Sequence, residues 1–160
     1  MRLFIIRHAI AVERSPDLPD DARPLTEEGK KRFREAARGL ARMFPKPDLL
    51  LTSPLVRAQQ TARIAARAWH VRITEEVALA GGSVSELEAA LRKLPAESTV
   101  ALVGHEPQVS EFLAHVIGST QPDRVTFKKG GVAVVDRPAG SDGPGMLVAM
   151  LPPRVLRVSR

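Results

Sequence analysis

Three short, almost entirely apolar runs constrain the fold of this chain most strongly. They are Leu3–Ile6, Leu49–Leu51 and Thr99–Val103, and segments with helical periodicity separate them. A strand whose residues are apolar on both faces is typical of the centre of a parallel sheet, because helices cover both faces of such a sheet. The runs therefore predict a buried, mostly parallel sheet.

The first two segments between these runs carry helix signals. Thr26 can cap a helix with Glu27 and Glu28 in its first turn, and Pro45 and Pro47 end it. One face of that helix is marked by apolar residues at helical spacing, namely Phe33, Ala37, Leu40 and Phe44. Ser53-Pro54 predicts a second helix start, with Ser53 as N-cap, Pro54 as first helical residue and an end near Trp69.

The middle of the chain predicts a further strand and two further helices. Residues 71–74 alternate weakly and are expected to form a strand. A capping box formed by Ser85 with Glu88, or equally by Ser83 with Glu86, starts a helix that ends near Leu94. Residues 104–107 turn the chain into another helix, which ends near Gly118.

The last third of the chain predicts a hairpin at a sheet edge. Val132–Val135 and Met146–Met150 are expected to be its strands, joined by the loop Pro138–Gly145. With the preceding order of strands and helices, this predicts an α/β fold, a three-layer αβα sandwich with a mostly parallel central sheet and a late edge hairpin. Because no internal repeat or linker divides the chain, we expect a single domain over residues 1–160.

Composition excludes several classes of site. The chain has no cysteine, which excludes disulfides, thiolate zinc sites and a cysteine nucleophile. No carboxylate–histidine cluster has metal-ligand spacing, so we expect neither a metal nor a cofactor. No apolar run approaches the roughly 20 residues that span a bilayer, and the N-terminal run is too short for a signal peptide. We therefore expect a cytoplasmic monomer without a membrane partner.

The net charge of +6 fits a nucleic-acid, membrane or phosphate-bearing partner. Aromatic residues make up only 4% of the chain and tyrosine is absent, so few side chains could stack on bases. Most basic residues fall in helical patterns, such as Lys30–Arg32, Arg63 and Arg67, which is typical of a solvated helix face. A phosphorylated substrate is therefore expected rather than nucleic acid.

Three polar segments follow the ends of predicted strands. They contain Arg7-His8, Arg57 in Ser53–Thr61, and Gly104-His105. In open α/β sheets ligands bind beyond the carboxyl ends of the strands, so the three segments can converge there. Each also has a structural interpretation: a paired strand end, an exposed helix arginine and a loop histidine. His70 and His115 are assigned to structure, because they lie within or at the ends of helical patterns.

Arg57 is informative by its place in the predicted helix. It would occupy the fourth position, where a cation opposes the helix dipole. The same helix end presents free N–H groups that suit a phosphate, and an arginine there would add bidentate contacts. Gly104 would let the backbone turn sharply or approach a ligand.

Taken together, these motifs resemble the histidine phosphatase superfamily, which includes the phosphoglycerate mutases. The resemblance rests on Arg7-His8, on Ser-Pro-x-x-Arg-Ala-x-Gln-Thr from Ser53 and on Gly104-His105. It is closest to the SixA-type branch, the phosphohistidine phosphatases, through residues 7–11 and 23–29. The resemblance covers nearly the whole chain, in order.

The resemblance implies a metal-independent phosphatase. A neutral nitrogen of His8 would attack phosphorus and form a phosphohistidine intermediate, which water then hydrolyses. The other ring nitrogen would carry a proton held by a backbone carbonyl or a carboxylate. Arg7, Arg57 and His105 would bind the phosphoryl oxygens, since phosphoryl transfer depends mostly on positioning and charge stabilisation.

The sequence departs from the wider superfamily in two places. Ala9 stands where glycine commonly follows Arg-His, and the segment 71–98 is short where larger members carry a glutamate general acid in an insertion. Candidate replacements for that proton donor are Glu75, Glu76, Asp20 and Asp21. None of the four matches a motif that assigns it.

A weak or missing general acid favours a good leaving group. Imidazole, with a conjugate pKa near 6.5, needs much less protonation than an alkoxide. The expected substrate is therefore phosphohistidine in a protein, such as a signalling protein. The alternatives are a broad-specificity phosphomonoesterase on small metabolites, a catalytically inactive phosphate-binding module, and a basic nucleic-acid-binding domain.

Overall fold

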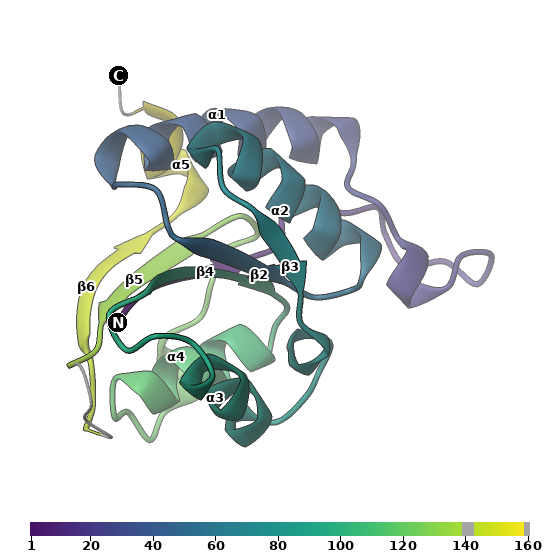
Figure 1. The fold of residues 1–160 in the computed structure, drawn as a ribbon. Helices are drawn as coiled ribbons and strands as arrows, with labels where there is room; N and C mark the ends of the chain where they lie inside the picture. The colour runs from purple at the N-terminus through teal and green to yellow at the C-terminus, as the bar shows by residue number, and fades with distance from the viewer. Residues whose placement is uncertain (139–142, 159–160) are drawn as a thin grey trace.

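The apolar runs form the centre of one six-stranded sheet in the computed structural model, which describes residues 1–138 and 143–158 (Figure 1). The strand order is β3-β2-β4-β1-β5-β6. The strands are β1 (Arg2–Arg7), β2 (Leu49–Thr52), β3 (Ile73–Glu75), β4 (Thr99–Gly104), β5 (Val132–Asp136) and β6 (Met146–Leu151).

The sheet is mostly parallel, as predicted. β1 pairs parallel with β4, and β2 pairs parallel with both β4 and β3. β5 pairs antiparallel with β1 on one side and with β6 on the other, so β5 runs opposite to the other described strands. The predicted edge hairpin is confirmed. Residues 139–142 of its predicted loop lie outside the described residues.

Helices cover both faces of the sheet (Figure 1). α1 (Glu27–Met43), α2 (Val56–Trp69) and α5 (Pro153–Val158) lie on one face, and α3 (Val84–Arg92) and α4 (Gln108–Val116) lie on the other. Short 3-10 turns are η1 (Asp20–Ala22), η2 (Val77–Leu79) and η3 (Pro122–Arg124). Together these layers form the predicted sandwich.

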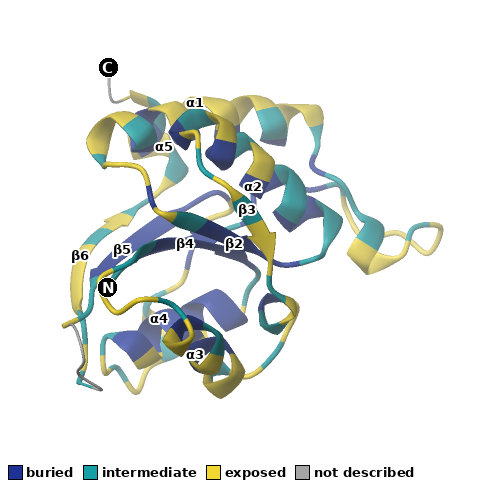
Figure 2. Cartoon of the chain, viewed as in Figure 1, coloured by how far each residue is buried: buried dark blue, intermediate teal, exposed yellow. Residues whose placement is uncertain are grey.

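Alternate residues of β1 divide the hydrophobic core into two parts. Phe4 packs with Phe33 of α1 in one cluster, whereas Leu3 packs with Phe112 of α4 in the other. All four side chains are at most 2% exposed, and Figure 2 shows the central strands as buried along their length. Burial of this kind stabilises each side chain by about 1.5–3 kcal/mol, so the sheet is held from both sides.

Two of the predicted helix starts are confirmed. Thr26 caps α1, since its hydroxyl accepts a hydrogen bond from the Gly29 N–H at 2.9 Å. Of the two capping boxes predicted for α3, the structure has Ser83 with Glu86, and Ser85 lies inside the helix. Helix α5 is an addition that the sequence analysis did not predict.

The predicted start of α2 is wrong. The helix begins at Val56, so Arg57 is its second residue rather than its fourth. Ser53 still belongs to the sheet edge, because its N–H donates to the Val103 carbonyl. Its hydroxyl contacts Nε2 of His105 at 2.8 Å and therefore does not act as the N-cap.

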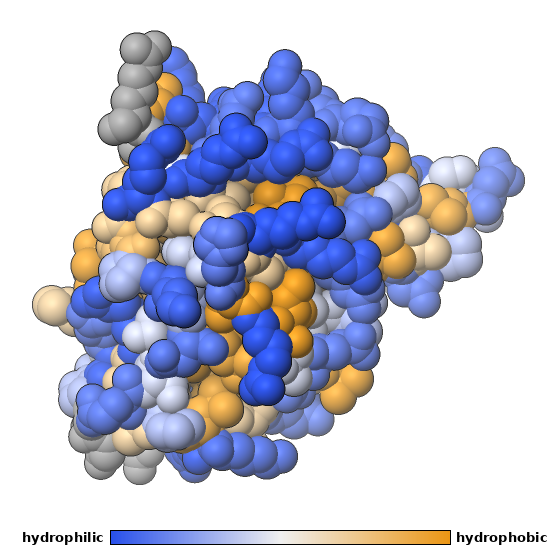
Figure 3. All heavy atoms as spheres, turned by 45° about the horizontal axis from the view of Figure 1, so that its top comes forward, coloured by the Kyte–Doolittle hydropathy of each residue, from blue (hydrophilic) through white to orange (hydrophobic). Residues whose placement is uncertain are grey.

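Much of the basic surplus lies on the outer face of α1, where Figure 3 shows a hydrophilic surface. The exposed basic residues of this helix are Lys31, Arg32, Arg34, Arg38 and Arg42. This placement agrees with the predicted solvated helix face. Among the residues described, we find no helix with the length and apolar character needed to cross a membrane.

Candidate active site

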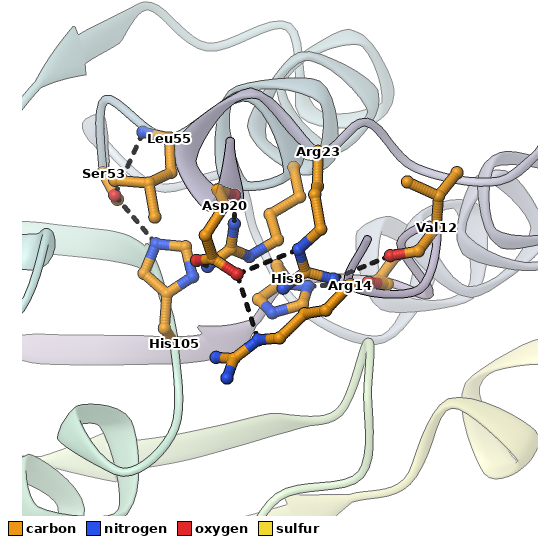
Figure 4. A network of polar contacts seen from close by, with 10 residues as sticks. His8, Val12, Arg14, Asp20, Arg23, Ser53, Leu55 and His105 are labelled. Carbon is orange, nitrogen blue, oxygen red and sulfur yellow. Dashed lines mark hydrogen bonds and ion pairs between the residues drawn. The ribbon is translucent and has the colours of Figure 1, made fainter. Parts of the chain in front are cut away.

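Strand register brings three of the predicted segments to one edge of the sheet. Arg7 at the end of β1 lies opposite Gly104 at the end of β4, and Thr52 at the end of β2 lies opposite Val103. Because these strands are parallel, their carboxyl ends coincide. The residues that follow, His8, Ser53 and His105, are therefore neighbours (Figure 4).

His8 is buried and its ring orientation is defined. Its Nδ1 lies 2.7 Å from the carbonyl oxygen of Ala9. A carbonyl only accepts hydrogen bonds, so Nδ1 carries the proton and Nε2 keeps its lone pair in the neutral ring. The ring centroid lies 5.2 Å from that of His105. The tautomer with its proton on Nδ1 is the one that attack through Nε2 requires.

Burial lowers the pKa of His8 to about 4. The hydrogen bond to Ala9 opposes this shift, while the positive charges of Arg57 and Arg7 reinforce it. A histidine surrounded by cations and removed from water resists protonation. His8 is therefore neutral near pH 7.

His105 is held by Ser53, a contact that the sequence analysis did not predict. Ser53 is fully buried, and its hydroxyl oxygen accepts a hydrogen bond from the Leu55 N–H at 3.3 Å. If the Ser53 hydroxyl donates to Nε2 of His105, Nδ1 carries the ring proton. That Nδ1 is buried without a partner among the described residues, so it would be free to donate to a ligand.

Burial also lowers the pKa of His105, to about 3. Interactions with His8 and Arg57 lower it further, while the charge of Asp20 raises it. Both imidazoles are thus neutral near pH 7, and the positive charge of the site resides on its arginines.

Arg57 reaches the same site from the first turn of α2. Its side chain is 6% exposed, and Nη2 donates to Oδ2 of Asp20 at 3.0 Å. The carbonyl of Arg57 accepts from the Thr61 hydroxyl, which in turn accepts from the Ala9 N–H at 3.0 Å. Thr61 therefore ties the start of α2 to the residue after His8.

Arg7 directly precedes His8, and its positive charge helps to lower the pKa of His8. Its Nη1 donates to the Phe127 carbonyl at 2.6 Å, and its Nε is buried without a partner in the described part of the chain. The N–H of Phe127 donates to Glu106 at 2.9 Å, so the segment before β5 is fixed between Arg7 and Glu106. A cleft of about 630 Å³ adjoins Arg7 there, between α4 and η3.

The structure separates the four predicted proton donors. Glu75 accepts from Gln59 at 2.9 Å, and Glu76 accepts from the Ala78 N–H at 3.0 Å. Asp21 is exposed, whereas Asp20 reaches the arginines of the site (Figure 4). Only Asp20 among the four candidates therefore contacts the group of His8, Arg57 and His105 in the described structure.

Two small residues have roles that differ from the expectation. At Gly104 an added Cβ would lie 3.0 Å from Val109 Cγ1, so close packing against α4, rather than a sharp turn, favours glycine. Ala9 replaces the glycine common in the superfamily without strain, because His70 is the only non-glycine residue with positive φ among those described. The methyl group of Ala9 is buried in the core.

No group of three or more His, Asp or Glu side chains within residues 1–138 and 143–158 is arranged to hold a metal ion. Two site residues, Ser53 and Thr61, were not predicted from the sequence, because their signals were weak. Ser53 and Thr61 belong to the arginine motif, but nothing in the pattern shows which partners their hydroxyls have.

The sequence profile of the histidine phosphatase superfamily (branch 1) matches residues 3–90. An uncharacterised protein of Picosynechococcus sp. is 33% identical over 137 residues, which is 82% of each chain.

Solved structures agree with this match. The protein histidine phosphatase SixA, solved with tungstate, has a TM-score of 0.85 and 27% identity over 98% of this chain and 99% of that one. A protein of Agrobacterium tumefaciens that carries the SixA name has a TM-score of 0.80 and 26% identity over 94% and 97%. The α-ribazole phosphatase from Shigella flexneri, at 20% identity and a TM-score of 0.70 over 91% and 99%, shares the fold.

Proposed function

Because the chain belongs to branch 1 of the histidine phosphatase superfamily and is a SixA-type phosphatase, we propose that His8 is its nucleophile. The observation that carries this proposal is the hydrogen bond between Nδ1 of His8 and the Ala9 carbonyl. It leaves Nε2 as a lone-pair donor in a ring whose pKa is about 4. A neutral, oriented imidazole of this kind is an activated nucleophile near pH 7.

In the proposed reaction Nε2 of His8 forms a bond to phosphorus while the bond to the leaving group breaks with its electron pair. Arg7 and Arg57 bind the phosphoryl oxygens and offset their charge, and Nδ1 of His105 donates a further hydrogen bond. Water then attacks phosphorus, the bond to Nε2 breaks, and phosphate leaves. Ser53 acts in this scheme as a positioning residue for His105.

The intermediate provides the test of this mechanism. Protein quenched during turnover of a ³²P-labelled substrate should carry acid-labile, base-stable label, as expected for phosphohistidine. His8→Ala should carry none, whereas His70→Asn, which changes an exposed histidine, should be labelled like the wild type. Equal labelling of His8→Ala would show that another residue is the nucleophile.

For the substrate, we propose phosphohistidine in a protein. The support is the state of the candidate acids: Glu75 and Glu76 are hydrogen-bonded elsewhere, and Asp20 is ion-paired with arginines. Without a protonated carboxyl over the scissile bond, the leaving group must depart with little help. An imidazole leaving group meets that condition far better than an alkoxide.

A leaving-group series distinguishes this proposal from a broad phosphomonoesterase on small metabolites. Phosphohistidine protein and p-nitrophenyl phosphate should be hydrolysed well, and alkyl or sugar phosphates about 100- to 10,000-fold more slowly, the usual effect of a missing general acid. A flat rate across the series, with chemistry limiting, would favour the metabolite phosphatase. Phosphate binding without any turnover would indicate an inactive binding module.

A further inference from the structure

The carboxylate of Asp20 lies among three arginines at the candidate phosphate site. Its Oδ1 contacts Nε of Arg23 at 3.0 Å and Nε of Arg14 at 3.1 Å, and its Oδ2 accepts from Nη2 of Arg57 at 3.0 Å (Figure 4). The main-chain carbonyl of Asp20 also accepts from Arg57. Neither Arg23 nor Arg14 was among the site residues expected from the sequence.

The loop that carries these residues is anchored at its base. Ala11 forms a bridge with Leu25, and the Val12 N–H donates to the Pro24 carbonyl. Nη1 of Arg23 donates to the Val12 carbonyl at 2.7 Å, which fixes the guanidinium and the direction of its Nε. Arg23 is therefore a rigid donor, and Asp20 is the group that it meets.

The exposures of the partners are unequal. The side chains of Arg57 and Arg23 are 6% and 12% exposed, whereas that of Asp20 is 46% exposed. Asp20 thus approaches buried guanidiniums from the solvent side, the side from which a phosphoryl group would enter. Its carboxylate can return to water at little cost, but Arg57 cannot, because a buried guanidinium needs an anionic partner.

The charges favour an exchange of anions. One carboxylate faces three guanidiniums, whereas a phosphoryl group carries up to two charges and three acceptor oxygens near pH 7. Partial burial raises the pKa of Asp20, but Arg57 and Arg23 outweigh it, so the carboxyl remains charged. It thus competes with phosphate as an anion.

We propose that Arg23 is a further phosphoryl-binding residue and that the Asp20 carboxylate occupies its oxyanion position until substrate displaces it. This inference rests on the proposed phosphatase site and adds a competition for that site within the free enzyme. If the Asp20 carboxylate occupies the oxyanion position in about nine-tenths of the free enzyme molecules, the enzyme binds phosphate about tenfold more weakly than it would with that position open. Only the molecules with an open position can bind phosphate.

The test is the affinity of the full chain for inorganic phosphate, measured by titration calorimetry at pH 7.5. Asp20→Asn should bind phosphate about three- to tenfold more tightly than the wild type. Asp21→Asn removes the same charge from the adjacent exposed residue and should change the affinity less than twofold. If Asp20 only braces the loop, Asp20→Asn should instead bind phosphate more weakly, and that result would overturn the proposal.

A second set of variants tests the part played by Arg23. Arg23→Ala, checked for a native thermal transition, should weaken phosphate binding about tenfold or more, and Asp20→Asn should then give a smaller gain in that background. Unchanged affinity in folded Arg23→Ala overturns the assignment of Arg23.

The same measurements also distinguish failure of the inference about Asp20 and Arg23 from failure of the proposed phosphatase site. If the wild type binds phosphate and Arg57→Ala does not, the proposed site stands whatever Asp20→Asn does. If the wild type itself binds no phosphate, the proposed site and the inference both fall.

Discussion

At the residue scale, nucleophilic attack and phosphate binding are assigned to different side chains. His8 supplies a neutral nitrogen, whereas Arg7 and Arg57 supply the positive charge. We therefore expect His8→Ala to abolish turnover while leaving phosphate affinity within about threefold of the wild type, since charged hydrogen bonds provide most of the binding. Steady-state kinetics and calorimetric titration measure the two effects separately.

Arg57→Ala is the matched comparison. It should weaken phosphate binding and turnover together, because it removes a buried guanidinium that faces the site. Near-normal turnover in His8→Ala would contradict the assignment of the nucleophile. Normal phosphate affinity in Arg57→Ala would contradict the assignment of the anion site.

Burial of two neutral histidines makes the stability of the protein depend on pH. The pKa is about 4 for His8 and about 3 for His105 in the folded state, against 6.5 in the unfolded chain. Between these values the unfolded state binds more protons, so the free energy of unfolding rises with pH up to about 6.5. This stabilisation is present above pH 6.5 and is lost as the pH falls toward 4.

Denaturant unfolding between pH 4 and 7 checks this dependence. The free energy of unfolding should rise less between pH 4 and 7 in His8→Asn than in the wild type. The difference between the two rises should be on the order of a few kcal/mol. His70→Asn is the control, since asparagine tolerates the left-handed backbone at φ 54° and this histidine is exposed. An identical slope in His8→Asn and the wild type would show that His8 titrates normally.

At the scale of elements, two Ser residues with similar sequence signals have different structural roles. Ser83 caps α3 in a box with Glu86, whereas the hydroxyl of Ser53 contacts His105 and α2 begins three residues later. A local motif predicts a helix cap correctly only where the side chain of the capping residue does not hydrogen-bond to a residue from elsewhere in the fold. The second partner of Ser53 is His105, which follows β4 and is far away in the sequence.

The cap of α3 gives a prediction with a matched control. Ser83→Ala should lower the free energy of unfolding by about 1 kcal/mol, the usual effect of losing an N-cap. Ser85→Ala, two residues later and exposed, should change it by less than about 0.5 kcal/mol. Chemical denaturation measures both. Equal losses would mean that the capping box contributes little to stability.

At the scale of the whole molecule, the proposed chemistry relies on arginine and histidine side chains gathered at one edge of the sheet. We therefore expect phosphatase activity to survive exhaustive dialysis against EDTA, with a change of less than about twofold, because the proposed steps use no metal. Activity that EDTA abolishes and a divalent ion restores would reject the histidine mechanism. A p-nitrophenyl phosphate assay suffices for this test.

The sequence by itself determined the layers of this protein and the residue types at its site. Apolar runs such as Leu3–Ile6 are buried on both faces, and Arg7-His8 and Gly104-His105 lie at the carboxyl ends of strands. These features are local, because burial pattern and position in a strand depend on residues adjacent in the chain. Parallel strands then fix where their ends meet, so convergence of these motifs could be predicted.

The tertiary structure decided which side chains face one another. Asp20, rather than Glu75, Glu76 or Asp21, contacts Arg57 because the loop that carries Asp20 folds back over the sheet edge. Arg23, three residues after Asp20, joins the site for the same reason. The contact of Ser53 with His105 depends on the pairing of β2 with β4. Charges and hydrogen bonds act through space over a few ångströms, and the linear sequence records only which residue types were available.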